Sequence, residues 1–155
     1  MIEGAEELER KLNSISDAMR KEIIEKAVWK GIQTVRAEAV LLCPVDTGEL
    51  RSSIKTNIEV SSDTVFGIVY TNKEYAPYVE FGTGPAGKEN HSGISPEVTV
   101  EYRQTGWSYK DEDGNWVYTN GQPAQPFLYP ALKNNETHVK KQIIDEISDE
   151  LERMV

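Results

Sequence analysis

The residues best suited to chemistry are Asp46, Thr47 and Gly48, which form an Asp-Thr-Gly tripeptide. In aspartic proteases of the retroviral type, such a tripeptide supplies one carboxylate, and a second chain supplies the carboxylate that shares its proton. A chain of 155 residues could form such a dimer. One hypothesis for the function is therefore a dimeric aspartic protease that uses Asp46.

The residues around this tripeptide favour a structural interpretation instead. The segment before it carries a helical period, and Pro44 both ends a helix and interrupts strand pairing. Glu49 stands where those enzymes have a small residue, and it follows Asp46 by three positions, the spacing of a capping box. We therefore predict that Asp46 caps a short helical turn, that Gly48 permits a tight path, and that no residue is catalytic.

A glycine-rich segment begins at Gly82 and matches both the pattern G-x-G-x-x-G and the start of a P-loop. Both patterns require a strand before the glycines and a helix after them, so that the helix N-terminus meets a phosphate. Glu89 stands where a P-loop has Ser or Thr, and Pro85 removes a backbone donor. We predict a flexible surface loop and no bound nucleotide or other cofactor.

Metal-binding patterns are incomplete in this chain. Asp111, Asp113 and Asn115 have the first three spacings of an EF-hand loop, but Trp116 occupies the position of its required glycine. The two histidines, His91 and His138, lack the spacing of zinc ligands. We expect a hairpin turn at the aspartates and no metal site.

The composition is that of a globular domain on the polar side, with 38% hydrophobic and 28% charged residues. The net charge of −9 argues against tight DNA binding, which needs several Lys or Arg side chains on phosphates. Cys43 is the one cysteine, so an internal disulfide is excluded, and we expect a small buried residue at a helix end. No window is apolar enough for a membrane span, and the acidic N-terminus lacks a signal pattern, so we expect synthesis in the cytoplasm.

Hydrophobic periodicity predicts helices at both ends of the chain. Apolar residues recur every three or four positions from about residue 4 to 42, and serines predict a break near residues 14–16. A second helix is predicted to begin at residues 126–130 and to keep one apolar face to the end of the chain. Five carboxylates at residues 145–152 oppose the dipole of this helix, so its last turns are expected to fray or to bind a basic group.

Strands are predicted between these helices. Residues 54–60 and 64–70 form an antiparallel hairpin around a Ser-Ser-Asp turn, and residues 98–102 form a further strand. A second hairpin joins residues 107–110 to 115–119 through Asp-Glu-Asp-Gly. The expected fold is α+β, with a long N-terminal helix, a small mostly antiparallel sheet carrying an inserted hairpin, and a C-terminal helix.

Three segments in this order, residues 44–54, 75–84 and 125–132, resemble the tailed-phage virion family of the Hong Kong 97 type, whose members are described as tail-component, tail-completion or neck proteins. The resemblance covers nearly the whole chain. It implies a single domain over residues 1–155, with a variable loop and hairpin at about 85–122. The residues to which it gives structural roles are Pro44, Asp46, Thr47, Gly48, Leu50, Ser53, Ile54, Tyr78, Val79, Glu80, Gly82, Thr83, Gly84, Pro126, Phe127, Pro130 and Ala131.

The resemblance also implies a function without catalysis. Such a chain is a structural protein of a phage or prophage virion at the head–tail joint, assembled in the bacterial cytoplasm. Its partners are other virion proteins, namely the head-closure or connector protein and the tail terminator or tail tube. It forms a ring of its own copies, a hexamer, with no membrane partner and with DNA only as passing cargo. The alternatives are the Asp46 protease and a general protein-binding assembly factor.

Overall fold

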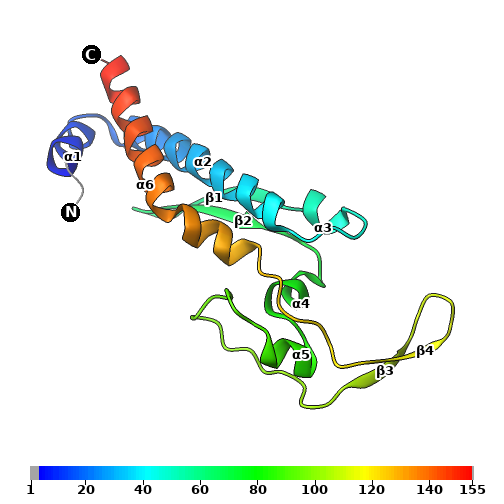
Figure 1. The fold of residues 1–155 in the computed structure, drawn as a ribbon. Coiled ribbons are helices and arrows are strands. Elements are labelled where there is room, and N and C mark those ends of the chain that lie inside the picture. Colours follow the sequence, from blue (N-terminus) through cyan, green and yellow to red (C-terminus); the bar gives the residue numbers. More distant parts are fainter. Residues whose placement is uncertain (1–3, 155) are drawn as a thin grey trace. The chain divides into compact units, whose positions relative to one another are not determined.

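A computed structural model describes residues 4–154 (Figure 1). Its elements are α1 (Ala5–Asn13), α2 (Asp17–Leu42), α3 (Glu49–Ser52), β1 (Lys55–Val60), β2 (Val65–Tyr70), α4 (Ala76–Phe81), α5 (Gly84–Glu89), β3 (Trp107–Lys110), β4 (Trp116–Thr119) and α6 (Leu128–Arg153). β1 pairs with β2, and β3 pairs with β4, each in its own antiparallel sheet. The predicted α+β fold is therefore confirmed.

The described chain divides into two compact units. Unit 1 contains residues 4–37, 55–70 and 134–154, and unit 2 contains residues 38–54 and 71–133. The single domain over residues 1–155 that the resemblance implies stays a prediction.

The predicted break in the N-terminal helix is confirmed, since α1 ends at Asn13 and α2 begins at Asp17. The Ser14 hydroxyl donates to the carbonyl of Lys11 at 2.6 Å, and Ser16 Oγ accepts from the backbone of Met19 at 3.3 Å. These serines satisfy backbone groups that the interrupted helix leaves free. The core of unit 1 gathers apolar side chains of α1, α2 and α6: Leu8, Leu12, Ile15, Ile23, Ile24, Ala27, Ile143, Ile147 and Leu151.

One face of the β1–β2 hairpin lies directly on α2. The register runs from Lys55 opposite Tyr70 to Val60 opposite Val65, as the predicted hairpin requires. A Cβ atom at Gly67 would lie 2.3 Å from Ile32 Cγ2. The absence of a side chain at Gly67 therefore allows the strand to approach the helix closely.

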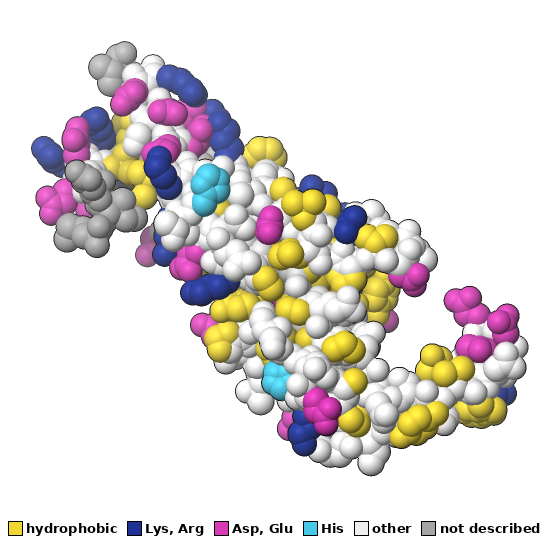
Figure 2. All heavy atoms as spheres, viewed as in Figure 1, with side chains coloured by type: hydrophobic (Ala, Val, Ile, Leu, Met, Phe, Trp, Pro, Cys, Tyr) yellow, Lys and Arg dark blue, Asp and Glu magenta, His cyan; other side chains and the backbone are white. Residues whose placement is uncertain are grey.

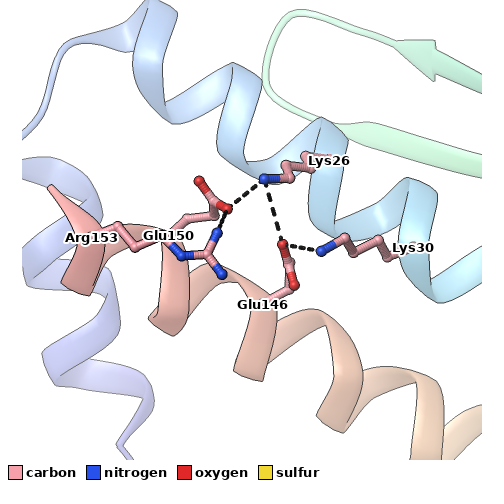
Figure 3. A network of polar contacts seen from close by, with 5 residues as sticks. All are labelled: Lys26, Lys30, Glu146, Glu150 and Arg153. Atoms are coloured by element: carbon pink, nitrogen blue, oxygen red, sulfur yellow. Dashed lines mark hydrogen bonds and ion pairs between the residues drawn. The ribbon is translucent and has the colours of Figure 1, made fainter.

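The acidic end of α6 is matched by lysines of α2 (Figure 3). Lys26 Nζ lies 2.5 Å from Glu150 Oε1, and Lys30 Nζ lies 2.6 Å from Glu146 Oε1. Arg153 also pairs with Glu150. The hydrogen bond from Lys26 lowers the pKa of Glu150. The basic group expected near these carboxylates is therefore supplied by the chain itself, and α6 extends to Arg153.

In unit 2 the β3–β4 hairpin is confirmed, but the strand predicted at residues 98–102 is wrong. That segment has no strand among the described residues, because neither edge of the β3–β4 sheet pairs with it. It is anchored by a side chain instead, since the Tyr102 hydroxyl donates to the carbonyl of Phe81 at 2.7 Å. None of the helices in residues 4–154 combines the length and apolar character that crossing a membrane requires.

Candidate functional site

The first sequence motif, residues 44–54, forms a corner after α2. The helix ends at Leu42, as Pro44 predicts. Arg51 Nη2 donates to the carbonyl of Cys43 at 2.9 Å, so a cation satisfies a carbonyl just beyond the helix end. Leu50 and Ile54 are buried beneath this corner.

The predicted role of Asp46 as the cap of α3 is wrong. Gly48 is the N-cap residue, with φ of 84° in the left-handed region, and no side chain bonds there as a cap. Thr47 Oγ1 accepts from the backbone of Glu49 at 3.3 Å, while Asp46 is exposed and two residues further from the helix than an N-cap must be. Glu49 does not close a capping box either, because its carboxylate pairs with Lys73.

Glu80, in the second motif, is the central polar group of unit 2. Its side chain lies on α4 and is only 5% exposed, yet its carboxylate accepts three backbone hydrogen bonds. The donors are the N–H groups of Phe127 at 2.7 Å, Leu128 at 3.0 Å and Tyr129 at 3.0 Å. A remote carboxylate thus satisfies the free N–H groups at the start of α6 and complements its dipole. We call this arrangement the Glu80 clamp.

Two further hydrogen bonds reinforce the Glu80 clamp. The Gln125 N–H donates to the carbonyl of Val79 at 2.8 Å, and Gln122 Nε2 donates to the carbonyl of Tyr78 at 3.1 Å. Sequence reasoning placed Glu80 among the structural residues but missed this role. The available signal was a lone carboxylate within an otherwise apolar stretch, Ala-Pro-Tyr-Val-Glu-Phe.

The glycine segment is a packed connection, so the flexible loop predicted there is wrong. Gly82 has φ of 76°, and a Cβ atom on it would lie 2.7 Å from the backbone N of Ala124. Thr83 exchanges backbone hydrogen bonds with Gln122 at 2.9 and 3.2 Å. Gly84 begins α5, a helix that the sequence did not predict. The element before Gly82 is a helix rather than the strand that a phosphate-binding loop requires.

The third motif opens α6 as predicted. Phe127 and Ala131 are fully buried, and Pro130 lies in the first turn, where its missing N–H costs no helical hydrogen bond. Pro126 directly precedes the first residue that the Glu80 clamp holds. The three motifs are therefore brought together within unit 2.

Cys43 is buried beside the charged groups of this corner. Burial raises the pKa of its thiol, Arg51 partly lowers it, and Glu80 adds to the rise. Because the thiolate is the reactive form, the thiol at this position is a poor nucleophile near neutral pH. The predicted small buried residue at a helix end is confirmed.

The surface above this corner is hollowed into a groove of about 580 Å³, which we call the motif groove. Its lining comes from the corner, from the second motif and from residues 122 and 125: Pro44, Val45, Asp46, Thr47, Gly48, Glu49, Leu50, Tyr75, Tyr78, Val79, Gln122 and Gln125. Tyr78 is 58% exposed, an unusual state for a large aromatic side chain. The groove offers aromatic contact area and amides, which suit a protein partner.

The chemistry available in the motif groove is limited. Two carboxylates line the groove. Glu49 forms a salt bridge with Lys73, whereas Asp46 is exposed and forms none with the described residues. A protease would need a second carboxylate from another chain, and the element before Asp46 is a helix rather than a strand. No cluster of His, Cys, Asp and Glu suited to a metal ion occurs in the described part of the chain.

The described residues thus contain an α+β set of elements with two hairpins, and unit 2 carries a groove above its corner. Residues 6–82 match the family described as Bacteriophage HK97-gp10, putative tail-component. The recognition from the sequence motifs is thereby confirmed, and it indicates a phage structural role in the virion. The match includes the first motif and nearly all of the second, while the third lies outside it. Comparison with curated proteins and with solved structures gave no match.

Proposed function

We propose that the chain is a tail-completion protein at the head–tail joint of a tailed phage or prophage. It acts as a ring of its own copies, a hexamer, between the head-closure or connector protein and the tail terminator or tail tube. DNA passes through the ring as cargo, and the chain performs no catalysis. The observation that carries this proposal is the family match over residues 6–82, which includes the corner around the motif groove.

The geometry of unit 2 supports binding rather than reaction. The Glu80 clamp and the Gly82–Gln122 connection hold backbone segments far apart in sequence in one arrangement. The exposed rings of Tyr75 and Tyr78 line the motif groove, and these hydrogen bonds and close contacts hold the backbone beneath them. Rigid aromatic anchors of this kind are typical of protein interfaces, because they bury area with little loss of side-chain freedom.

The test is disruption of the gene in the phage or prophage that encodes it. We expect filled heads and separate tails in electron micrographs, and joined virions after complementation with the wild-type gene. Complementation with Tyr78→Ala should lower the yield of joined particles. Trp29→Ala, which removes a similarly exposed ring from α2 in unit 1, serves as the matched control. Joined, infectious particles without the gene would contradict the proposal.

The protease hypothesis is tested with one substitution. Asp46→Asn removes the only acid that this hypothesis uses and changes no hydrogen bond of α3. We expect equal yields of joined virions with Asp46 and with Asn at this position. Acid-dependent cleavage of peptides that disappears in Asp46→Asn would favour the enzyme instead.

A further inference from the structure

The β3–β4 hairpin exposes two large aromatic side chains on one face. Lys110 pairs with Trp116, and Ser108 with Tyr118, so these four side chains share a face by strand alternation. Trp116 is 71% exposed and Tyr118 is 65% exposed. Figure 2 shows hydrophobic side chains gathered over this hairpin and acidic side chains at its tip. We call this surface the hairpin face.

The hairpin is held in a defined conformation. Asp111 Oδ1 accepts from the N–H groups of Asp113 at 3.0 Å and Asn115 at 2.8 Å, and the Asp111 N–H donates to the carbonyl of Asn115 at 2.9 Å. The Lys110 ammonium lies 5.4 Å from the centre of the Trp116 ring. A two-stranded hairpin alone is marginally stable, so a covering surface would stabilise it.

Unit 2 also carries an apolar groove of about 470 Å³ at the base of this hairpin. We call it the aromatic groove. Its wall includes Pro77, Phe81, Val100, Tyr102, Arg103 and Trp107. The Arg103 guanidinium lies 5.2 Å from the centre of the Trp107 ring. The groove thus combines apolar area with a cation, which suits an aromatic side chain.

The hairpin face does not reach the aromatic groove of its own chain. Trp107 begins β3 and forms part of the groove wall, whereas Trp116 lies opposite Lys110 at the far end of the strands. Four residues of strand separate the two ends by about 10 Å. The hairpin extends away from α4 and α5, which border the groove (Figure 1). A second copy of the chain is needed to bring the two surfaces together.

Charge favours the same pairing. The hairpin tip exposes Glu112 and Asp113, while Arg103 lines the aromatic groove and Lys88 lies beside it through a hydrogen bond to Gln104. The groove also contains one acid, Glu101, and the hairpin carries one base, Lys110. The two acids at the hairpin tip and the two bases at or beside the groove have opposite charge, which favours docking in one register.

We propose that the hairpin face of one copy docks in the aromatic groove of the next copy. The two surfaces differ, so the contact is heterologous, and repetition produces a closed ring when the rotation between copies closes. This inference rests on the proposed function, which requires such a ring, and adds the surface that holds neighbouring copies together.

The test uses two variants of the chain, each with a single cysteine at a different position. Both carry Cys43→Ala; one adds Asn115→Cys on the hairpin, and the other adds Thr99→Cys beside the groove. A short bismaleimide is added to each full-length chain alone and to their mixture. We expect a cross-linked dimer in the mixture and little in either variant alone, because only the mixture brings the two surfaces together with a thiol on each.

Matched substitutions then assign the cross-link to this contact. Trp116→Ala on the hairpin variant should lower the dimer yield about tenfold or more, as loss of an aromatic anchor does. Trp29→Ala should leave the yield unchanged. Arg103→Glu should lower it, and Glu112→Lys on the hairpin variant should restore it. An absent mixed dimer, or a yield insensitive to Trp116→Ala, overturns the inference.

The outcome is separable from that of the proposed function. Heads and tails that join normally in a phage carrying Trp116→Ala and Tyr118→Ala would overturn the hairpin contact while leaving the head–tail role intact. Normal joining without the gene would overturn the head–tail role itself.

Discussion

At the scale of residues, Glu80 connects two of the three sequence motifs. Its carboxylate accepts from consecutive N–H groups at the start of α6, which are otherwise left without partners in a buried or partly buried position. The groove-forming tyrosines belong to the same short helix as Glu80 or directly precede it. The stability of the Glu80 clamp therefore determines how firmly the motif groove is held.

Replacement of Glu80 tests this dependence. Glu80→Ala leaves three N–H groups without their acceptor, and we expect the free energy of unfolding to fall by about 3 kcal/mol. Glu80→Gln keeps one acceptor oxygen and should lower the free energy of unfolding by about half as much. Glu74→Ala, at an exposed position before α4, is the control and should change stability little. The measurement is urea unfolding followed by circular dichroism, and equal stabilities of Glu80→Ala and wild type would contradict the clamp.

The buried thiol gives a prediction about alkaline pH. The folded state raises the pKa of Cys43 above its ordinary value of 9.0, chiefly by burial. Above that value the unfolded chain loses the proton more readily than the folded chain, so stability falls as the pH rises. We expect the unfolding free energy to decline less between pH 8 and pH 10 in Cys43→Ala than in wild type. Identical declines in wild type and Cys43→Ala would show that this thiol does not cause the loss of stability. Fast labelling of the Cys43 thiol by a thiol reagent without urea would show that the thiol is not buried.

At the scale of elements, the contact between β2 and α2 depends on Gly67. An alanine here would gain about 0.4–1 kcal/mol from the reduced freedom of the unfolded chain. Its Cβ would also meet Ile32 and Val28 at 2.3 and 2.8 Å, and such overpacking costs about 1–3 kcal/mol. The second effect is the larger, so Gly67→Ala should lower the unfolding free energy by about 1–2 kcal/mol.

A second substitution on α2 checks the physical cause of this loss. Ile32→Ala removes the nearest of the atoms that the new methyl group would meet, so it should cost less in the Gly67→Ala background than in wild type. Ser62→Ala, in the exposed β1–β2 turn, should be neutral. Additive costs in the double variant would show that the strand does not meet the helix at this point.

The elements with regular hydrophobic spacing were predictable from the sequence. The break at residues 14–16, both hairpins and the start of α6 follow from apolar periodicity, serines and turn residues that act locally. The elements that failed depend on distant partners. α5 forms where Gly82 packs against residues 122–124, and Glu80 binds N–H groups at the start of α6 that lie 47 to 49 residues away in sequence. Residues 98–102 have strand-forming side chains but meet no free sheet edge.

The structure brings the three motifs together, but the contacts of individual residues could not be predicted from the sequence. The three motifs were expected to be structural, and the structure brings them together in unit 2. The cap was assigned to Asp46 because capping boxes are read from local spacing, whereas Gly48 starts α3 through its left-handed φ. Local spacing carries no information on which backbone groups a long acidic side chain reaches across the fold.

At the scale of the whole molecule, the net charge of −9 bears on how the chain meets DNA. The acidic end of α6 is partly neutralised by Lys26, Lys30 and Arg153, so several cations are already paired within the chain. DNA affinity requires Lys and Arg side chains that are free to replace counterions on phosphates. A head–tail joint through which DNA passes should therefore repel the duplex rather than hold it.

The last prediction follows from this charge balance. Fluorescence anisotropy of a labelled duplex should not rise on addition of the full-length chain, up to about 10 µM, at physiological salt. A repeat at low salt is the stricter trial, because weaker screening strengthens any attraction between DNA and a local basic surface. Trp116→Ala and Arg103→Glu should behave as wild type does, since the proposed contact between copies does not involve DNA. Retention of the duplex at physiological salt would mean that a local basic surface overrides the net charge, and DNA would then be a ligand of this chain rather than passing cargo.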